Sequence, residues 1–239
     1  MKQLLPILFI SLWSSYSGFS QVQTNSAGYE YAELYQSILD EYGFDQSLVN
    51  GVIYKDEYWN RIGHQFLLED QIYSGNLVFR GVEYKNLNLK YDIYSQQIVV
   101  NISHNNSTIG FIPPNDFISF FSINEIPFLK SDFQGKPKFY QVLFNSAKLS
   151  CFYYWYKVLD ETGRIGDRIS YKFSESRRKN FLKFDDSFER YTNNKSFIKL
   201  FPSKIKPDIK QYIKTNHIKV NKSNIDEVKE LLEYCNSLL

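Results

Sequence analysis

Apolar and polar residues alternate along most of the central part of this chain, from residue 52 to residue 191. At residues 87–94, for example, Leu87, Leu89, Tyr91 and Ile93 alternate with Asn88, Lys90, Asp92 and Tyr94. A period of two is typical of half-buried β-strands, because successive side chains of a strand point to opposite faces. Turn-forming segments interrupt the pattern at residues 95–97, 104–107, 113–116, 135–137, 145–148, 160–163 and 185–186. Short strands with frequent turns predict sequential hairpins, and therefore an antiparallel β meander, either a twisted sheet or an open barrel.

After residue 191 the spacing changes to that of amphipathic helices. Ser196 is expected to cap a short helix that ends near residue 201. Pro207 suits the first turn of a second helix, and Asn224, with Glu227 three residues later, is typical of the cap of a third. The last helix carries an apolar stripe, which must cover another surface: Ile225, Val228, Leu231, Leu232 and Cys235. These patterns predict an α+β fold in which C-terminal helices pack on the sheet.

The first 20 residues are typical of a signal peptide. Lys2 precedes an apolar run at residues 4–13, and small residues, Gly18 and Ser20, occupy positions −3 and −1 of a cut before Gln21. The run is shorter than the ~20 residues that span a bilayer. We therefore expect an exported protein, periplasmic or extracellular, without a transmembrane segment. Residues 21–239 are predicted to form one β-rich domain, with a helix at residues 29–42 and a helical segment at about 196–239.

Charge is distributed unevenly along a chain whose formal net charge is only +2. Residues 177–222 contain 13 Lys and Arg against four acidic residues, a local net charge of +9. The overall balance argues against nucleic-acid binding, but the basic segment could form a surface for an anionic partner, such as an anionic membrane surface or glycan. The alternative is a solvated helix face without a partner. The lysines expected to form this surface are Lys204, Lys206, Lys210 and Lys214.

The densest aromatic segment lies at residues 152–156. Alternation along a strand would place Tyr154 and Tyr156 on one face and Trp155 on the other. Such a strand needs cover on both faces or a ligand on one, since aromatic faces suit sugars and apolar ligands. Tyr154, Trp155 and Tyr156 are therefore candidate ligand-binding residues, and cover by the C-terminal helices is the alternative.

Catalytic signals are sparse. His64 could bind a ligand or act as a base, and Asp92 or Asp70 could supply a carboxylate, but none of them belongs to a recognised catalytic or metal-binding motif. No cofactor, metal or catalytic residue is predicted. Cys151 and Cys235 do not form a metal-binding pattern, and whether they pair in a disulfide stays open.

Residues 75–100 carry a recognisable pattern. A strand begins at Gly75, a Gly-x-x-Tyr step follows at residues 81–84, and a Leu-x-Tyr-Asp-x-Tyr strand at residues 89–94 leads to a Val-rich return. This pattern, with Gly-His-Gln-Phe at residues 63–66 and the segment 196–201, resembles a family of uncharacterised exported proteins of Bacteroidetes-type Gram-negative bacteria. The resemblance implies an exported β-rich domain and assigns no activity.

Two functions from different classes fit these observations. The first is a non-catalytic protein that binds or interacts with a component of the cell envelope. The second is an envelope hydrolase whose site is assembled from dispersed residues such as His64 and Asp92. A protein embedded in the outer membrane is less consistent with the pattern, because the strands show no continuous lipid-facing set of side chains.

Overall fold

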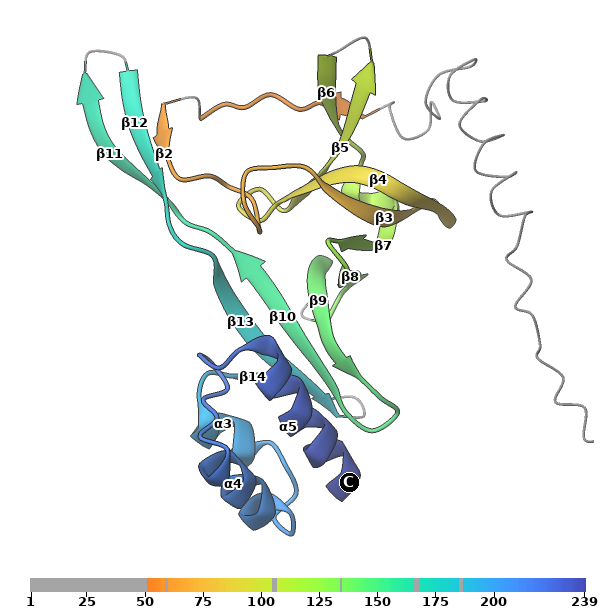
Figure 1. Cartoon of the computed structure of the whole chain (residues 1–239), viewed down its shortest axis with the longest axis vertical. Helices are drawn as coiled ribbons and strands as arrows, with labels where there is room; N and C mark the ends of the chain where they lie inside the picture. The colour runs from red at the N-terminus through yellow and green to blue at the C-terminus, as the bar shows by residue number, and fades with distance from the viewer. Residues whose placement is uncertain (1–50, 59, 105–106, 134, 166–167, 185–186) are drawn as a thin grey trace, which may run out of the picture. The chain divides into compact units, whose positions relative to one another are not determined.

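The structure is a computed structural model that describes residues 51–58, 60–104, 107–133, 135–165, 168–184 and 187–239. The expected signal peptide at residues 1–20 and the expected helix at residues 29–42 lie outside these residues. The described part is mainly antiparallel β-sheet with C-terminal helices, which confirms the predicted fold class (Figure 1). The strands are β1 (Val52–Ile53), β2 (Arg61–Ile62), β3 (Tyr73–Phe79), β4 (Val82–Asp92), β5 (Gln97–His104), β6 (Ser107–Ile112), β7 (Ile118–Ile123), β8 (Ile126–Ser131), β9 (Lys138–Asn145), β10 (Ser150–Tyr156), β11 (Leu159–Ile165), β12 (Arg168–Phe173), β13 (Arg177–Phe184) and β14 (Ser187–Tyr191). The helices are the 3-10 helix η1 (Asn115–Phe117) and the α-helices α3 (Asn194–Lys199), α4 (Lys206–Thr215) and α5 (Ile225–Leu238).

The larger sheet is open and has 11 strands in the order β1-β6-β5-β4-β3-β7-β8-β9-β10-β13-β14. Two meanders, β3 to β6 and β7 to β10, meet where β3 pairs with β7. Every pairing in this sheet is antiparallel. The predicted limits of the sheet, residues 52 and 191, are the first residue of β1 and the last of β14. Strand β8 was not expected from the alternation, because Pro127 interrupts a segment of only six residues.

A second sheet of three strands has the order β11-β12-β2. The sequence predicted a turn at residues 160–163, but this expectation is wrong: the segment belongs to β11, which pairs with β12. The register shifts between Glu161 and Gly163, so the polar, Gly-containing segment forms an irregularity in a strand instead of a turn. The β12–β2 pair is parallel, unlike any pairing in the larger sheet.

Aromatic side chains form the core of the two meanders. Tyr91, Phe121 and Phe128 are at most 1% exposed, and the rings of Phe121 and Phe128 stack with their centroids 4.7 Å apart. The ring of Tyr91 meets both edge to face, at interplanar angles of 67° and 66° and with centroid distances of 5.0 and 5.2 Å. Burial of large aromatic surfaces is a major source of stability, which explains why a chain so rich in Phe and Tyr forms this sheet.

Two of the three helix starts predicted from the sequence agree with the structure. Pro207 lies in the first turn of α4, and the Asn224 side chain accepts a hydrogen bond from the Glu227 N–H at the start of α5. The expectation that Ser196 caps α3 is wrong. The cap is Asn193, and Ser196 is the third helical residue of a reciprocal capping box. Asn is as good a cap as Ser, so side-chain chemistry alone did not separate the two positions.

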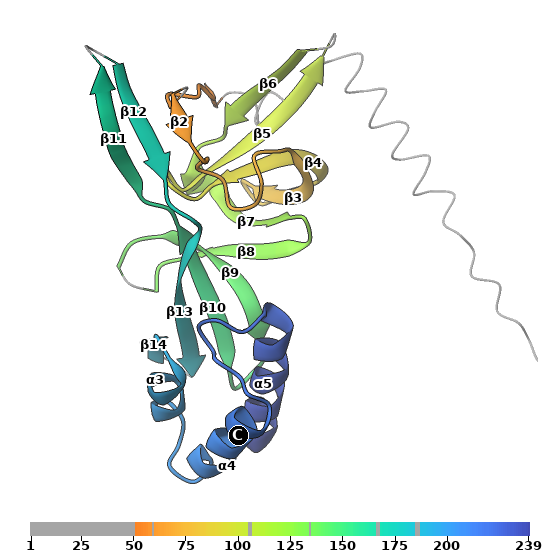
Figure 2. The same cartoon turned by 60° about the vertical axis from the view of Figure 1, so that its left-hand side comes forward.

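The C-terminal helices cover one face of β9, β10, β13 and β14 (Figures 1 and 2). Their shared core contains Tyr153, Tyr191, Phe197, Ile209 and Leu232, all at most 1% exposed. The predicted apolar stripe of α5 lies in this core apart from Ile225, which is partly buried against it. Both cysteines are in the same core and are free thiols, which answers the question of their pairing.

Candidate functional site

Two concave regions are lined by consecutive parts of the segment between α4 and α5. We call the first the lysine groove and the second the Trp155 cleft. The lysine groove, about 810 Å³, is lined by Asn194, Lys195, Ile198, Lys210, Ile213, Lys214, His217, Ile218 and Lys219. The Trp155 cleft, about 500 Å³, is lined by Trp155, Ser176, Arg178, Lys179, Asn180, Arg190, Tyr191, Thr192, Asn221, Lys222 and Ser223. Residues 217–223 supply one wall to each region.

The lysine groove is built by α3, α4 and the segment after α4. The Asn194 side chain donates to the Ile218 carbonyl at 2.7 Å and accepts from the Val220 N–H at 2.9 Å. This amide therefore holds the segment against α3. Ile213 and Ile218 are buried, while Lys210 and Lys214 of α4 are exposed. An apolar floor with a rim of cations results.

The end of α4 places His217 on the rim. The His217 N–H donates to the Lys214 carbonyl and the Ile218 N–H to the Ile213 carbonyl. This is the Schellman pattern, in which the residue after the cap takes a left-handed conformation that favours glycine. His217 adopts it with φ of 53°. The geometry thus keeps an imidazole at a position where a glycine would be less strained.

The cations of this region are not neutralised by neighbours. Residues 192–222 contain eight lysines and one acidic residue, Asp208. Within the part of the chain that the structure describes, none of these lysines forms an ion pair. The eight are Lys195, Lys199, Lys204, Lys206, Lys210, Lys214, Lys219 and Lys222.

The sequence analysis predicted only some of the residues that line the lysine groove. Of the four lysines it singled out, Lys210 and Lys214 line the groove, whereas Lys204 and Lys206 do not. It missed Lys195 and Lys219. Helical spacing was a usable signal for Lys210 and Lys214, but no local signal brings Lys195 and Lys219 to the same groove. Their proximity depends on how the segment after α4 folds back onto α3.

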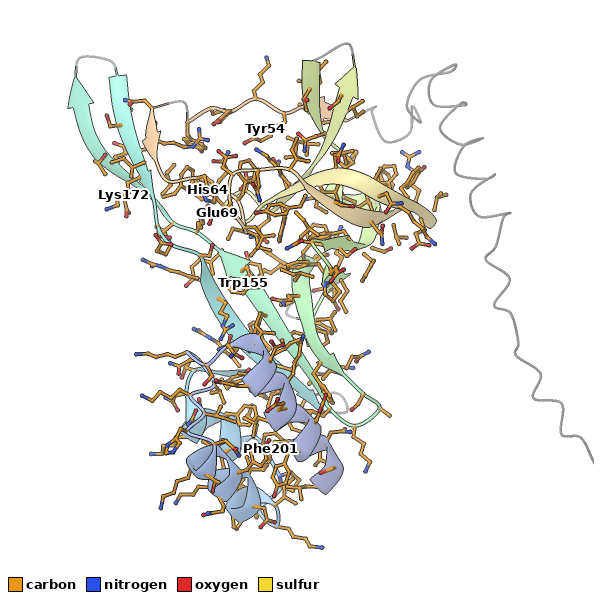
Figure 3. The ribbon with its side chains drawn as sticks, viewed as in Figure 1. Tyr54, His64, Glu69, Trp155, Lys172 and Phe201 are labelled. Atoms are coloured by element: carbon orange, nitrogen blue, oxygen red, sulfur yellow. The ribbon has the colours of Figure 1, made fainter. Side chains whose placement is uncertain are left out.

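The predicted trio of aromatic residues divides between two faces of β10, as alternation requires. Trp155 packs partly buried against the helix-covered core and lines the Trp155 cleft. Tyr154 packs against a separate cluster of Tyr140, Phe152 and Phe181, and its ring stacks with that of Tyr156. Figure 3 shows Trp155 between the helices and the segment that carries His64 and Glu69.

Hydrogen bonds and ring contacts fix the aromatic wall of the cleft. Trp155 Nε1 donates to Gln141 Oε1 at 2.6 Å, and Gln96 Nε2 donates to the Trp155 carbonyl at 2.9 Å. The guanidinium of Arg178, directly opposite Trp155 in the β10–β13 pair, lies 4.2 Å from the ring centroid of Tyr153 and 5.7 Å from that of Trp155. Cation–π contacts of this kind hold an arginine in place without using its hydrogen-bond donors.

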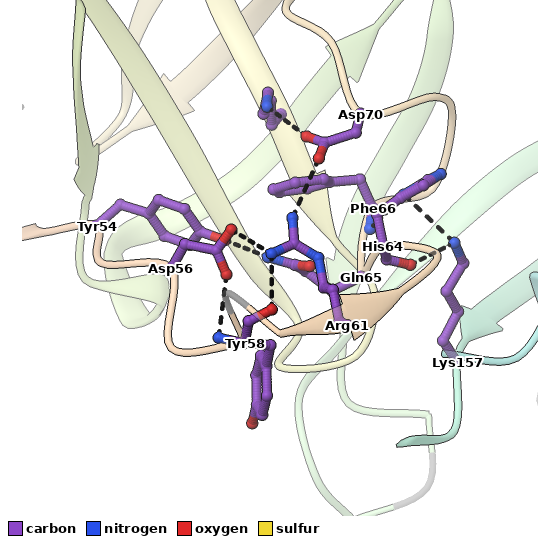
Figure 4. A network of polar contacts seen from close by, with 10 residues as sticks. Tyr54, Asp56, Tyr58, Arg61, His64, Gln65, Phe66, Asp70 and Lys157 are labelled. Carbon is purple, nitrogen blue, oxygen red and sulfur yellow. Dashed lines mark hydrogen bonds and ion pairs between the residues drawn. The ribbon is translucent and has the colours of Figure 1, made fainter. Parts of the chain in front are cut away.

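His64 lies in a different environment, beside Lys157 (Figure 4). Lys157 is only 8% exposed. Its Nζ donates to the His64 carbonyl at 2.6 Å and lies 3.4 Å from His64 Nδ1. Nδ1 also accepts from the Phe66 N–H at 3.2 Å. A small cavity of about 280 Å³ adjoins this pair. These contacts orient the imidazole and fasten the segment around residues 64–66 to the end of β10.

Asp92 has local partners of its own. Its Oδ1 accepts from the N–H groups of Tyr94 and Ser95, each at 2.8 Å, which closes the turn after β4. Burial raises the pKa of Asp92, although these two donors oppose the change. Asp70 instead accepts from Lys90 at 2.7 Å and Arg61 at 3.2 Å. These contacts give both carboxylates structural roles, and neither forms a hydrogen bond with His64 in the described part of the chain.

His64 should make stability depend on pH. Burial, followed by the charge of Lys157, lowers the pKa of His64, with Asp70 and Glu69 opposing. An unfolded His takes up a proton near pH 6.5, so the unfolded state binds more protons than the folded state just below that pH. The free energy of unfolding should therefore fall as the pH drops from about 7.5 to 5. The loss should be smaller in His64→Gln, as measured by urea denaturation at both pH values.

The control is His217→Gln, which replaces an exposed histidine. It should retain the wild-type difference between the two pH values. The interpretation is wrong if His64→Gln retains that difference as well. Comparing each variant with the wild type removes the contribution of Asp92, which is present in all three proteins.

No protein-family model matches this chain, and no curated protein or solved structure is significantly similar to it. The resemblance based on residues 75–100 therefore stays a prediction. In the described segments, no group of three or more His, Cys, Asp or Glu side chains is placed to hold a metal ion. No helix in those segments is both long enough and apolar enough to cross a membrane.

Proposed function

We propose that this protein is exported and that its lysine groove binds an anionic lipid of the cell envelope without transforming it. The observation that carries this proposal is the combination of an apolar floor with a rim of lysines that lack acidic partners in the described part of the chain. The residues typical of a signal peptide support export. The destination is then the periplasm or the outside of the cell.

An anionic lipid matches both properties of the groove. Ile198, which is only partly buried, offers an apolar surface on which an acyl chain could lose contact with water, and Ile213 and Ile218 add the small part of their side chains that stays exposed. Lys210 and Lys214 lie one helical turn apart on the exposed face of α4 and can both approach a phosphate. Each lysine near an anionic membrane surface contributes about 1 kcal/mol of binding free energy. A solvated face with no partner would need no apolar floor.

Co-sedimentation with vesicles tests this proposal. The mature chain, residues 21–239, should bind vesicles of phosphatidylglycerol and phosphatidylcholine and should bind pure phosphatidylcholine at least tenfold more weakly. The quadruple variant Lys204→Glu, Lys206→Glu, Lys210→Glu, Lys214→Glu should lose at least tenfold in affinity, because it reverses the charge beside the groove. Binding of the wild type should weaken as salt rises, since ions screen the attraction.

Two controls separate the groove from net charge. A second quadruple variant reverses lysines elsewhere, Lys55, Lys85, Lys136 and Lys172, which are all exposed, and should lose much less affinity. Ile198→Ser changes no charge and should still weaken binding several-fold through the apolar floor. Equal losses of vesicle affinity in the two quadruple variants would show that net charge alone explains the binding. Unchanged binding in the first would show that the lysines are a solvated face.

A further inference from the structure

The Trp155 cleft differs chemically from the lysine groove, and what it could bind goes beyond the lipid binding proposed above. Its lining contains four cationic residues and no acidic one, together with hydroxyl and amide side chains. The apolar floor of the lysine groove has no counterpart here. A ligand of this cleft would therefore be an anion with polar groups, not an acyl chain.

Two of the cations come from elements far apart in sequence. Arg178 lies on β13, held over the ring of Tyr153, and Lys222 lies in the segment before α5. Neither forms an ion pair within the described residues. The backbone turn around Lys222 is fixed by the Ser223 hydroxyl, which accepts from the Lys219 N–H at 2.9 Å. The fold thus holds two positive charges around one cleft with no carboxylate to offset them.

Asn180 provides an independent observation. It lines the cleft on β13, it is only 5% exposed, and its Oδ1 has no hydrogen-bond partner in the described part of the chain. A buried acceptor without a donor destabilises a protein, and native structures contain few of them. A donor brought by a ligand, such as a hydroxyl group, would satisfy it. Neither Arg178 nor Lys222 donates to this oxygen.

We propose that the Trp155 cleft binds an acidic sugar, a saccharide unit that carries a phosphate or a carboxylate. Arg178 and Lys222 bind the anionic group, to which Arg can donate two parallel hydrogen bonds. A sugar hydroxyl donates to Asn180 Oδ1, and the indole of Trp155 offers an aromatic surface to the ring. The cleft, at about 500 Å³, lies within the usual range of small-molecule sites.

Fluorescence titration tests the acidic-sugar site. Trp59→Phe leaves Trp155 as the sole tryptophan of residues 21–239, so its emission reports on the cleft. Glucose 6-phosphate and glucuronate should each change the emission with at least tenfold higher affinity than glucose. Glucose 6-phosphate should also exceed inorganic phosphate tenfold. Absence of binding by both acidic sugars overturns the proposal, and equal affinity for inorganic phosphate reduces the cleft to a general anion site, which also overturns it.

Single substitutions test whether the side chains of Lys222 and Asn180 bind the acidic sugar. Lys222→Gln should weaken binding of glucose 6-phosphate about tenfold, the usual loss when a charge-assisted hydrogen bond is removed. Its matched control, Lys172→Gln, removes an exposed lysine of β12 and should bind as the wild type does. Asn180→Leu should weaken binding while the melting temperature stays level or rises, because the unpaired oxygen is gone. Equal losses in Lys222→Gln and Lys172→Gln would contradict the assignment.

The acidic sugar could be free or part of a glycolipid headgroup. Glucuronosyl diacylglycerol in phosphatidylcholine vesicles should compete with glucose 6-phosphate if the cleft accepts a headgroup, and should not compete if it accepts only the free sugar. The titrations with soluble sugars contain no lipid. Their failure would therefore leave the vesicle result for the lysine groove standing, and a failed vesicle assay would leave the sugar result standing.

Discussion

Phe197→Ala should lower the free energy of unfolding by about 4 kcal/mol, the usual loss for truncating a fully buried Phe. Phe197 is the buried residue of α3 and has no exposed surface. Its ring lies 5.1 Å, centroid to centroid, from the rings of both Tyr191 and Phe201. The variant leaves a cavity between the helices and the sheet, at the point where α3 packs on β14. Urea denaturation followed by far-UV circular dichroism measures the loss.

Phe117→Ala is the control for this substitution. Phe117 is 46% exposed, and its ring contacts the guanidinium of Arg80 and the edge of the buried Phe79 ring, so its truncation should cost about 1 kcal/mol or less. Similar losses in the two variants would mean that the helical layer contributes little to the cooperative core. The lysine groove and the Trp155 cleft both depend on that layer.

Gly75→Ala should be the second most damaging change, with a loss of about 3 kcal/mol in the free energy of unfolding. Gly75 lies in β3 and pairs with β4 on one side and β7 on the other. A Cβ at this position would overlap the backbone carbonyl of Ser122 and approach Leu89 Cδ1 to 2.8 Å. The backbone of a central strand cannot move away without breaking pairings on both sides, so overpacking here is expensive.

Gly163→Ala provides the comparison for Gly75→Ala. A Cβ at Gly163 meets nothing within 4 Å, and the residue lies in β11 of the small sheet. This change should leave the urea midpoint almost unaltered. A stable Gly75→Ala protein would show that β3 and β7 are less closely paired than the structure has them. That pairing joins the two meanders, so the outcome also bears on the topology.

Local chemistry was enough to predict several elements of this fold. Strict alternation placed Tyr154 and Trp155 on opposite faces of one strand, because the period of a β-strand does not depend on its partners. Pro207 and Asn224 marked helix starts for equally local reasons, since a proline lacks an N–H and an Asn side chain can accept from one. The limits of the sheet and the apolar stripe of α5 could likewise be predicted from the sequence.

The pairing of strands could not be predicted from the local sequence in the same way. Residues 160–163 have turn chemistry, yet they extend a strand because β12 supplies partners on one side. Similarly, β12 pairs with β2 in parallel across a separation of about a hundred residues. Asn193 and Ser196 both have good capping chemistry, and the position of the chain leaving β14 decides between them. In the two strand examples, pairing at long range outweighs local preference.

The sequence by itself determined which kinds of residue the candidate sites contain, namely lysines and an aromatic strand. Only the tertiary structure decided which of these residues lie together in one site. An excess of lysine in residues 177–222 was evident from counting, and Trp155 stood out in an aromatic strand. Which cations meet depends on the fold of residues 217–223, held by Asn194, which separates one basic surface into an apolar groove and a polar cleft. The Asn180 oxygen is buried and unpaired in the folded chain, where β13 lies between β10 and β14. Burial is a property of the whole packed chain, so no local pattern could have revealed it.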